Sequence, residues 1–130
     1  MTVWTTDELS RIENADELQI SPRGKGGALP APVTVWVVRN GDDVFVRSYR
    51  GENGRWYRGT QARHEGHVSA GGVDKDVSFV DVTDSDTNAQ VDTAYRAKYH
   101  RYGETMVGPM LAAAARATVI RVSPVESEIR

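Results

Sequence analysis

The amino-acid sequence predicts an α+β protein built on a small antiparallel β-barrel of six strands, flanked by short helices. Two observations lead to this prediction. Six short strand patterns follow one another along the chain, and an Asn40-Gly41 pair joins two of them. Asn-Gly between two β-branched runs is the strongest short signal for a hairpin. Strands joined in sequence by short turns favour an antiparallel sheet, and closing that sheet into a barrel removes its exposed edges.

The strand patterns are short runs rich in β-branched and aromatic residues. We expect strands at residues 17–21, 33–38, 44–49, 67–70, 77–82 and 118–122. The run at 33–38 is almost uninterrupted, which is typical of a strand covered on both faces. At the Asn40-Gly41 hairpin we expect Trp36 and Phe45 to lie in the buried layer.

Helices are expected at residues 6–14, 55–62, 84–102 and 110–116. A threonine can cap the first helix, and acidic residues fill its first turn. In the longest helix Val91, Tyr95 and Tyr99 share one face, so we expect both tyrosines to be buried. Pro109 stands where the last helix is expected to begin.

Composition and charge exclude several classes of protein. The chain has 130 residues, of which 39% are hydrophobic and 26% charged, as expected for a single domain over residues 1–130. It contains no cysteine, which excludes disulfides and thiolate sites. No secretory signal and no long apolar run are visible, so we expect a cytoplasmic protein without a membrane partner. A net charge of −2 argues against a nucleic-acid partner.

Two histidines stand three positions apart, at 64 and 67, and the only other histidine, His100, is distant in the sequence. Their spacing misses the His-Glu-x-x-His pattern of zinc sites, and Gly66 stands between them. The Gly-Lys-Gly-Gly run at residues 24–27 also lacks the spacing of a phosphate-binding loop. We therefore expect no metal site and interpret the glycine run as a flexible loop.

The segment from Arg47 to Arg63 is the most informative part of the chain, because it carries five arginines against one acidic residue. A strand is expected to end near Arg47 and Ser48, and after a glycine-rich turn a helix is expected to begin at Arg55. The amides of a helix N-terminus, together with arginines and a serine, can bind a phosphate. An alternative stays open, in which the arginines decorate the surface, Trp56 is core, and the charges pair with Asp74, Asp76 or Asp81.

The run from residue 31 to residue 62 resembles the split-barrel proteins that bind flavins and deazaflavins. These include the pyridoxamine-phosphate-oxidase-like proteins and the deazaflavin (F420)-dependent nitroreductases. The order of features is similar: a proline-led strand with a bulky residue, a Gly-Asp turn, a strand ending near a serine, glycines and a Trp-Tyr helix. Here those features are Pro32, Trp36, Gly41-Asp42, Ser48, Gly51, Gly54 and Trp56-Tyr57. The helix continues with Arg58-Gly59 where the nitroreductases have Asn-Leu.

Over nearly its whole length the chain is more closely similar to the bacterial DUF2255 family. Three patterns carry this resemblance: P-x-x-x-W-x-V-x-x-G-D, V-R-S followed by G-x-W-Y-R, and A-Y-R-x-K-Y. They begin here at Pro32, at Val46 with Gly54, and at Ala94.

The resemblance implies a split barrel that binds a phosphorylated flavin-type cofactor, FMN or F420, at the interface of a homodimer. Oxidoreductase chemistry would then be the activity, with no catalytic residue identified. The residues that would hold phosphate are Arg47, Ser48, Arg55 and Arg58, and those that would line the ring or the core are Trp36, Trp56 and Tyr57. The alternative is a cofactor-free ligand-binding or interaction module that keeps only the barrel.

Overall fold

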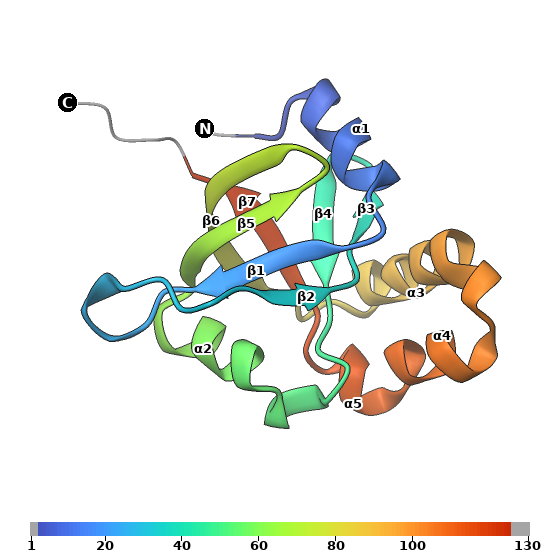
Figure 1. Cartoon of the computed structure of the whole chain (residues 1–130). Coiled ribbons are helices and arrows are strands. Elements are labelled where there is room, and N and C mark those ends of the chain that lie inside the picture. The colour runs from blue at the N-terminus through green and yellow to red at the C-terminus, as the bar shows by residue number, and fades with distance from the viewer. Residues whose placement is uncertain (1–2, 126–130) are drawn as a thin grey trace.

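Seven strands of the chain form one antiparallel sheet that curls into a half-barrel, with helices at its ends (Figure 1). This computed structural model describes residues 3–125. The strands are β1 (Leu18–Pro22), β2 (Val33–Val35), β3 (Val38–Asn40), β4 (Asp43–Val46), β5 (Glu65–Ala70), β6 (Val73–Asp81) and β7 (Ile120–Pro124). The helices are α1 (Thr6–Asn14), α2 (Arg55–Arg63), α3 (Ser85–Tyr99), α4 (Glu104–Leu111) and α5 (Ala113–Arg116). The strand order is β2-β1-β5-β6-β7-β4-β3.

The prediction of six strands was wrong, because the run at residues 33–38 forms two strands instead of one. β2 pairs with β1 and β3 pairs with β4, at opposite edges of the sheet. Only Trp36 and Val37 separate these two strands. Three Cα–Cα steps span at most about 11 Å, so the two edges must approach each other at this point and the sheet must curl. The run is not covered on both faces either, since Val33 and Thr34 are exposed.

Helix α3 satisfies the backbone groups of the crossing residue Val37, which has no strand partner. The Val37 amide donates to the Tyr99 hydroxyl (3.0 Å), and its carbonyl accepts from Lys98 Nζ (2.7 Å). The Tyr99 hydroxyl lies 2.7 Å from the Asp16 carbonyl, to which it can donate. Burial lowers the pKa of Lys98 to about 8. Buried backbone groups need such partners, so α3 holds the crossing in place.

The predicted hairpin at Asn40-Gly41 is confirmed. Asn40 pairs with Asp43, and Gly41 adopts a φ of 62°, a conformation that glycine reaches without steric cost. Phe45 is buried as expected, whereas Trp36 is only partly buried.

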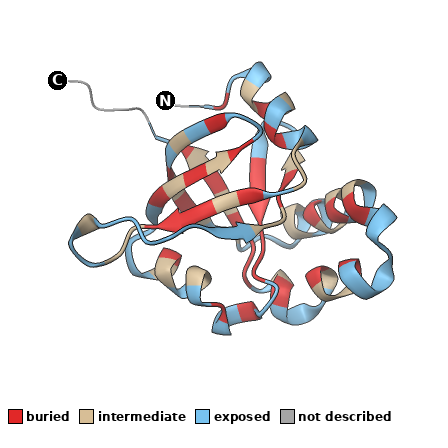
Figure 2. Cartoon of the chain, in the orientation of Figure 1, coloured by how far each residue is buried: buried red, intermediate tan, exposed pale blue. Residues whose placement is uncertain are grey.

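Buried apolar residues form two clusters on the two sides of β3 and β4 (Figure 2). The first fills the half-barrel, with Val37 and Val44 among its members, and Leu9 and Ile12 of α1 join it at one end. The second contains Phe45 and packs β3 and β4 against α3 and α4. Adjacent residues of a strand point to opposite faces, and this alternation lets one hairpin serve both clusters.

The helix predictions hold for α1 and α3 and fail in part after Gly103. Asp84 caps α3 by accepting from the Thr87 amide (2.8 Å), and Tyr95 and Tyr99 are buried. The expected helix over residues 110–116 is instead divided. Helix α4 begins at Glu104 and includes Pro109 in its last turn, and Ala112 is extended before α5 begins. No helix within residues 3–125 combines the length and apolar character needed to cross a membrane.

His67 links β5 to β6 and should make stability depend on pH. Its Nδ1 lies 2.9 Å from Asp76 Oδ1, and its Nε2 contacts Asp74. Partial burial works to lower the pKa of His67, but hydrogen bonds to Asp76 and Asp74 outweigh burial, and the pKa is raised. The folded state therefore binds this proton more tightly than the unfolded state. The resulting stabilisation is complete below about pH 6.5, the ordinary histidine pKa, and is lost as pH rises through the folded-state pKa.

We expect the unfolding midpoint of the native chain, relative to that of His67→Gln, to fall as pH rises through this range. Thermal or urea unfolding between pH 5 and pH 9 measures the difference. His100→Gln is the matched control, because His100 has no carboxylate partner within residues 3–125 and hydrogen-bonds to the Ala97 carbonyl. An identical pH profile for His67→Gln and the native chain would contradict this prediction.

Candidate functional site

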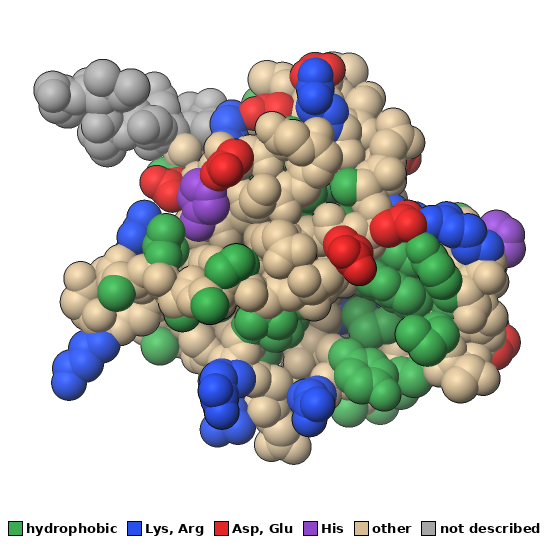
Figure 3. Space-filling model, viewed as in Figure 1, with side chains coloured by type: hydrophobic (Ala, Val, Ile, Leu, Met, Phe, Trp, Pro, Cys, Tyr) green, Lys and Arg blue, Asp and Glu red, His purple; other side chains and the backbone are tan. Residues whose placement is uncertain are grey.

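A cavity of about 880 Å³ opens between β2, the segment that follows β4, and α4. This volume lies in the range typical of sites for small molecules and cofactors. Its lining residues are Glu17, residues 33–36, residues 47–50, residues 53–56, Arg58, Thr105, Met106 and Met110. In the space-filling view, basic side chains gather below β2 near α2, and hydrophobic side chains gather beside α4 (Figure 3). The cavity therefore has a basic end and an apolar end.

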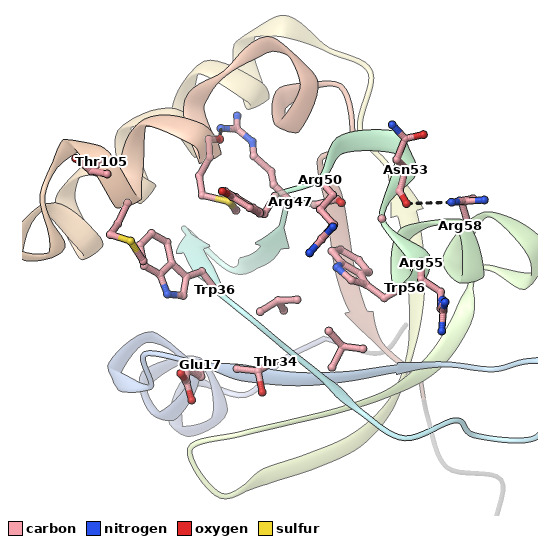
Figure 4. A pocket seen from close by; sticks show the side chains of 17 residues that line it. Glu17, Thr34, Trp36, Arg47, Arg50, Asn53, Arg55, Trp56, Arg58 and Thr105 are labelled. Carbon is pink, nitrogen blue, oxygen red and sulfur yellow. Dashed lines mark hydrogen bonds between the residues drawn. The ribbon is translucent and has the colours of Figure 1, made fainter.

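Six of the seven residues predicted for the site line this cavity. They are Trp36, Arg47, Ser48, Arg55, Trp56 and Arg58. Tyr57 does not line it and packs against the core of the half-barrel. Trp36 and Trp56 lie on opposite sides of the cavity (Figure 4). The curled sheet thus brings together two segments, residues 33–36 and 47–58, whose proximity the sequence did not indicate.

The basic end is built on the N-terminus of α2. Gly54 caps the helix without a side-chain hydrogen bond, and the first helical bond runs from the Arg58 amide to the Gly54 carbonyl (3.1 Å). The three preceding amides therefore have no partner inside the helix. A Cβ at position 54 would lie 2.4 Å from Ser48 Oγ, so glycine is needed for this close approach. The helix dipole adds partial positive charge at the same place.

Ser48 points a buried hydroxyl toward this helix end. Ser48 is 1% exposed, and its Oγ has no hydrogen-bond partner in the described chain. Its amide donates to Thr118 Oγ1 (2.9 Å), and that hydroxyl donates to the Ala115 carbonyl (2.7 Å). The backbone at Ser48 is therefore fixed while its hydroxyl is free. Buried hydroxyls are normally paired, so this one is a candidate ligand contact.

Three arginines surround this end without carboxylate partners in the described chain. Arg58 donates to the Asn53 carbonyl (3.1 Å; Figure 4), and the side chains of Arg50 and Arg55 form no ion pair or hydrogen bond within residues 3–125. The three aspartates that could have paired with these arginines instead bind other side chains. Two of them, Asp74 and Asp76, bind His67, and Asp81 accepts from Gln61 (2.9 Å). The positive charge at the basic end is therefore uncompensated by the acidic cluster.

Arg47 has protein partners of its own. Its guanidinium is buried, with Nη1 2.6 Å from Asp92 Oδ1 and 2.9 Å from the Met110 carbonyl. Nη2 donates to the Asn88 carbonyl (3.0 Å), and the guanidinium lies over the Tyr95 ring. Only Nε lacks a partner in the described chain. Arg47 therefore fastens α3 and α4 to the end of β4 and forms the wall of the cavity.

The apolar end combines aromatic and methionine side chains. Trp36 stacks on Tyr99 with ring centroids 4.0 Å apart and an interplanar angle of 2°. Met106 and Met110 contribute from successive turns of α4. Sequence reasoning missed both methionines, because the expected helix began at Met110 and left Met106 outside it. Their spacing of four residues, which places two side chains on one face of a helix, could have indicated that they act together.

The chemistry of the lining favours binding of an anionic, partly aromatic small molecule. Arginine and helix amides recognise phosphate or carboxylate, and flat side chains contact rings. Residues 3–125 contain no group of three or more histidine, aspartate or glutamate side chains that could hold a metal ion.

The fold is shared with several solved structures. The heme storage protein HutZ from Vibrio cholerae matches with a TM-score of 0.68 at 16% identity, over 98% of this chain and 93% of that one. The conserved hypothetical protein Rv2991 from Mycobacterium tuberculosis matches with a TM-score of 0.67 at 11% identity, over 98% and 83%. A FAD-binding protein from Mesorhizobium loti matches with a TM-score of 0.58 at 15% identity, over 95% and 92%. At these identities the likeness shows the fold alone.

The curled sheet and its cavity define a split-barrel protein with room for a ligand. The chain belongs to the family described as an uncharacterized protein conserved in bacteria (DUF2255), whose family model matches residues 8–122. The expected family membership is thus confirmed. A search of curated proteins found no match to this chain.

We expect Arg47→Met to destabilise the protein, because Asn88 and the Met110 carbonyl lose their buried partner and Asp92 keeps only Arg116. Leaving buried acceptors without their charged donor costs about 2 kcal/mol in free energy of unfolding. Urea unfolding followed by circular dichroism measures this loss. Arg55→Met is the matched control, since that side chain has no such partner and its replacement should leave stability unchanged. Equal stability of the two variants would show that Arg47 does not fasten the helices.

Proposed function

We propose that the cavity binds a phosphorylated flavin-type cofactor, FMN or deazaflavin F420. The observation that carries this proposal is the buried Ser48 hydroxyl, unpaired in the described chain, at the N-terminus of α2, where no side chain caps the helix. A phosphate there would accept hydrogen bonds from the hydroxyl and from the first helix amides. Gly54 lets the Ser48 hydroxyl lie against the helix N-terminus, since a Cβ at this position would lie 2.4 Å from Ser48 Oγ.

Different side chains around the cavity would then contact the phosphate and the ring of the cofactor. Arg50, Arg55 and Arg58 supply the charge that balances a phosphate, which carries about −1.5 to −2 at neutral pH. Trp36 and Trp56 offer flat surfaces to a ring system. Arg47 keeps its protein partners and supports the wall, instead of binding phosphate as the sequence suggested.

A cofactor of this class supplies hydride or electron transfer, so we propose oxidoreductase activity for the loaded protein. The chain's own residues would bind the cofactor, orient its ring toward the apolar end and exclude water there. Support for a cofactor site also comes from the neighbours, since the Mesorhizobium loti protein is described as FAD-binding and HutZ as a heme storage protein.

We expect Ser48→Ala and Arg55→Ala each to weaken FMN binding by about tenfold, because each removes a charged hydrogen bond of about 1.5 kcal/mol. Riboflavin, which lacks the phosphate, should bind the variants and the native chain equally. Fluorescence titration with FMN, riboflavin and F420 makes the comparison. Arg63→Ala, at the other end of α2, is the control for lost charge.

Two results would contradict the cofactor proposal. If neither FMN nor F420 bound the native chain, the protein would be a cofactor-free ligand-binding or interaction module. If Ser48→Ala weakened the binding of riboflavin as much as the binding of FMN, the hydroxyl would not contact phosphate.

We also propose that the protein is a homodimer in which a second copy covers the mouth of the cavity. Large apolar side chains surround this mouth, with Val33 exposed to 41%, Tyr49 to 64% and Met106 to 55%. Apolar groups clustered in this way favour association.

We expect Met106→Glu to shift the protein from dimer to monomer, because it places a charge in the covered surface. Light scattering after size-exclusion chromatography measures the mass. Leu29→Glu is the matched control, since Leu29 is 45% exposed and does not line the cavity. A native chain that is monomeric at all concentrations would rule out the dimer.

A further inference from the structure

Three aromatic rings lie in contact from the cavity to the molecular surface. Trp36 lines the cavity and stacks on Tyr99, with centroids 4.0 Å apart. The Tyr102 ring lies 5.6 Å from Trp36 and 6.1 Å from Tyr99. Tyr102 is 41% exposed. Electrons pass rapidly between aromatic rings at such separations, so the three rings offer a continuous route between cavity and solvent.

The outer ring has a base within hydrogen-bond reach. The Tyr102 hydroxyl donates to Asp16 Oδ2 (2.7 Å), which is inside the range for direct proton transfer. Hydrogen bonds from Arg101 and Tyr102 lower the pKa of Asp16. A phenol that has lost one electron is a far stronger acid than any carboxylic acid. Asp16 can therefore accept its proton even with a lowered pKa.

The middle ring lacks such a base. The Tyr99 hydroxyl contacts the backbone of Val37 and the carbonyl of Asp16, and a carbonyl does not take up a proton under these conditions. A cation lies beside each of the two rings, with Lys98 Nζ 5.2 Å from the centre of the Tyr99 ring and the Arg101 guanidinium 4.7 Å from that of Tyr102. The proton acceptor is therefore what distinguishes them. An oxidised site would therefore come to rest on Tyr102 and not on Tyr99.

We propose that Trp36, Tyr99 and Tyr102, with Asp16 as proton acceptor, form a relay that carries oxidising equivalents out of the cavity. A one-electron oxidant in the cavity takes an electron from Trp36. Tyr102 returns an electron to Trp36, directly or through Tyr99, and its Oη–H proton passes to Asp16. The oxidant is then reduced by one electron, Tyr102 is a neutral radical, and Asp16 is protonated.

The oxidant that the cavity would hold is a light-excited aromatic redox cofactor, of the class proposed above. The relay does not depend on that identification, because any one-electron oxidant near Trp36 would start it.

A second aromatic pair beside the cavity provides an internal comparison. Trp56 also lines the cavity, and its ring lies 6.3 Å from that of Tyr57. The Tyr57 hydroxyl forms no hydrogen bond within residues 3–125, and burial, with Asp81 and Glu52 nearby, raises its pKa. This pair has rings at a similar distance but no proton acceptor, so it should not trap the radical.

The absence of cysteine allows an oxidant to be placed at one position. Tyr49→Cys provides a unique thiol at the mouth of the cavity for a ruthenium polypyridyl photosensitiser, and it removes another exposed tyrosine there. A light flash with a soluble electron acceptor then generates the oxidant at the cavity that Trp36 and Trp56 line. Transient absorption and electron paramagnetic resonance identify tryptophan and tyrosine radicals. No flavin is present, so failure of cofactor binding and failure of the relay are separate results.

In the labelled chain we expect a tyrosyl radical that is lost in Tyr102→Phe and in Trp36→Phe. Asp16→Asn should slow its formation, because the proton acceptor is gone. Tyr57→Phe is the matched control and should leave the signal unchanged. A tyrosyl signal that survives Tyr102→Phe, or that disappears in Tyr57→Phe, would overturn the proposal. Circular dichroism of each labelled variant verifies that it is folded before the flash experiment.

Discussion

The two-residue crossing at Trp36 and Val37 is the constraint on which the rest of the structure depends. It joins strands at opposite edges of the sheet, and a link this short holds those edges together. The hydrogen bonds from Val37 to Tyr99 and Lys98 attach the crossing to α3. Adjacent residues of an extended chain point to opposite sides, so Val37 enters the core while Trp36 faces the cavity. One short segment therefore closes the half-barrel and supplies an aromatic wall of the site.

The same alternation separates structural and binding roles at the end of β4. Arg47 binds α3 and α4 through its two terminal nitrogens, and its neighbour Ser48 has its amide fixed by Thr118 while its hydroxyl lacks a partner in the described chain. The ion pair of Arg47 with Asp92 neutralises the one buried guanidinium of the wall. The arginines that remain uncompensated, Arg50, Arg55 and Arg58, all follow the strand and lie at the basic end of the cavity. The positive charge that a ligand would meet thus comes from the segment that follows β4.

Local patterns in the sequence predicted local structure well, and they failed where two distant elements decide the outcome. The cap at Asp84, the buried Tyr95 and Tyr99 and the hairpin at Asn40 each depend on a few neighbouring residues. The run at residues 33–38 looks like one strand, because β-branched residues favour strands without specifying an edge. Its division depends on Lys98 and Tyr99, more than 60 positions later in the chain. Arg47 could not be recognised as a structural residue for the same reason, since its partner Asp92 lies on another element.

The polarity of the cavity also fixes which end of a bound molecule would meet the aromatic contacts. Unpaired arginines and helix amides at one end attract an anion, and Trp36 with Met106 and Met110 at the other end favours an apolar ring. An amphipathic ligand with a phosphate would therefore bind in one orientation, with its ring beside Trp36. That position is where the stack with Tyr99 begins, and the stack ends at the exposed Tyr102 beside Asp16. The charge distribution that selects the ligand thus also determines which part of it could exchange electrons with the protein.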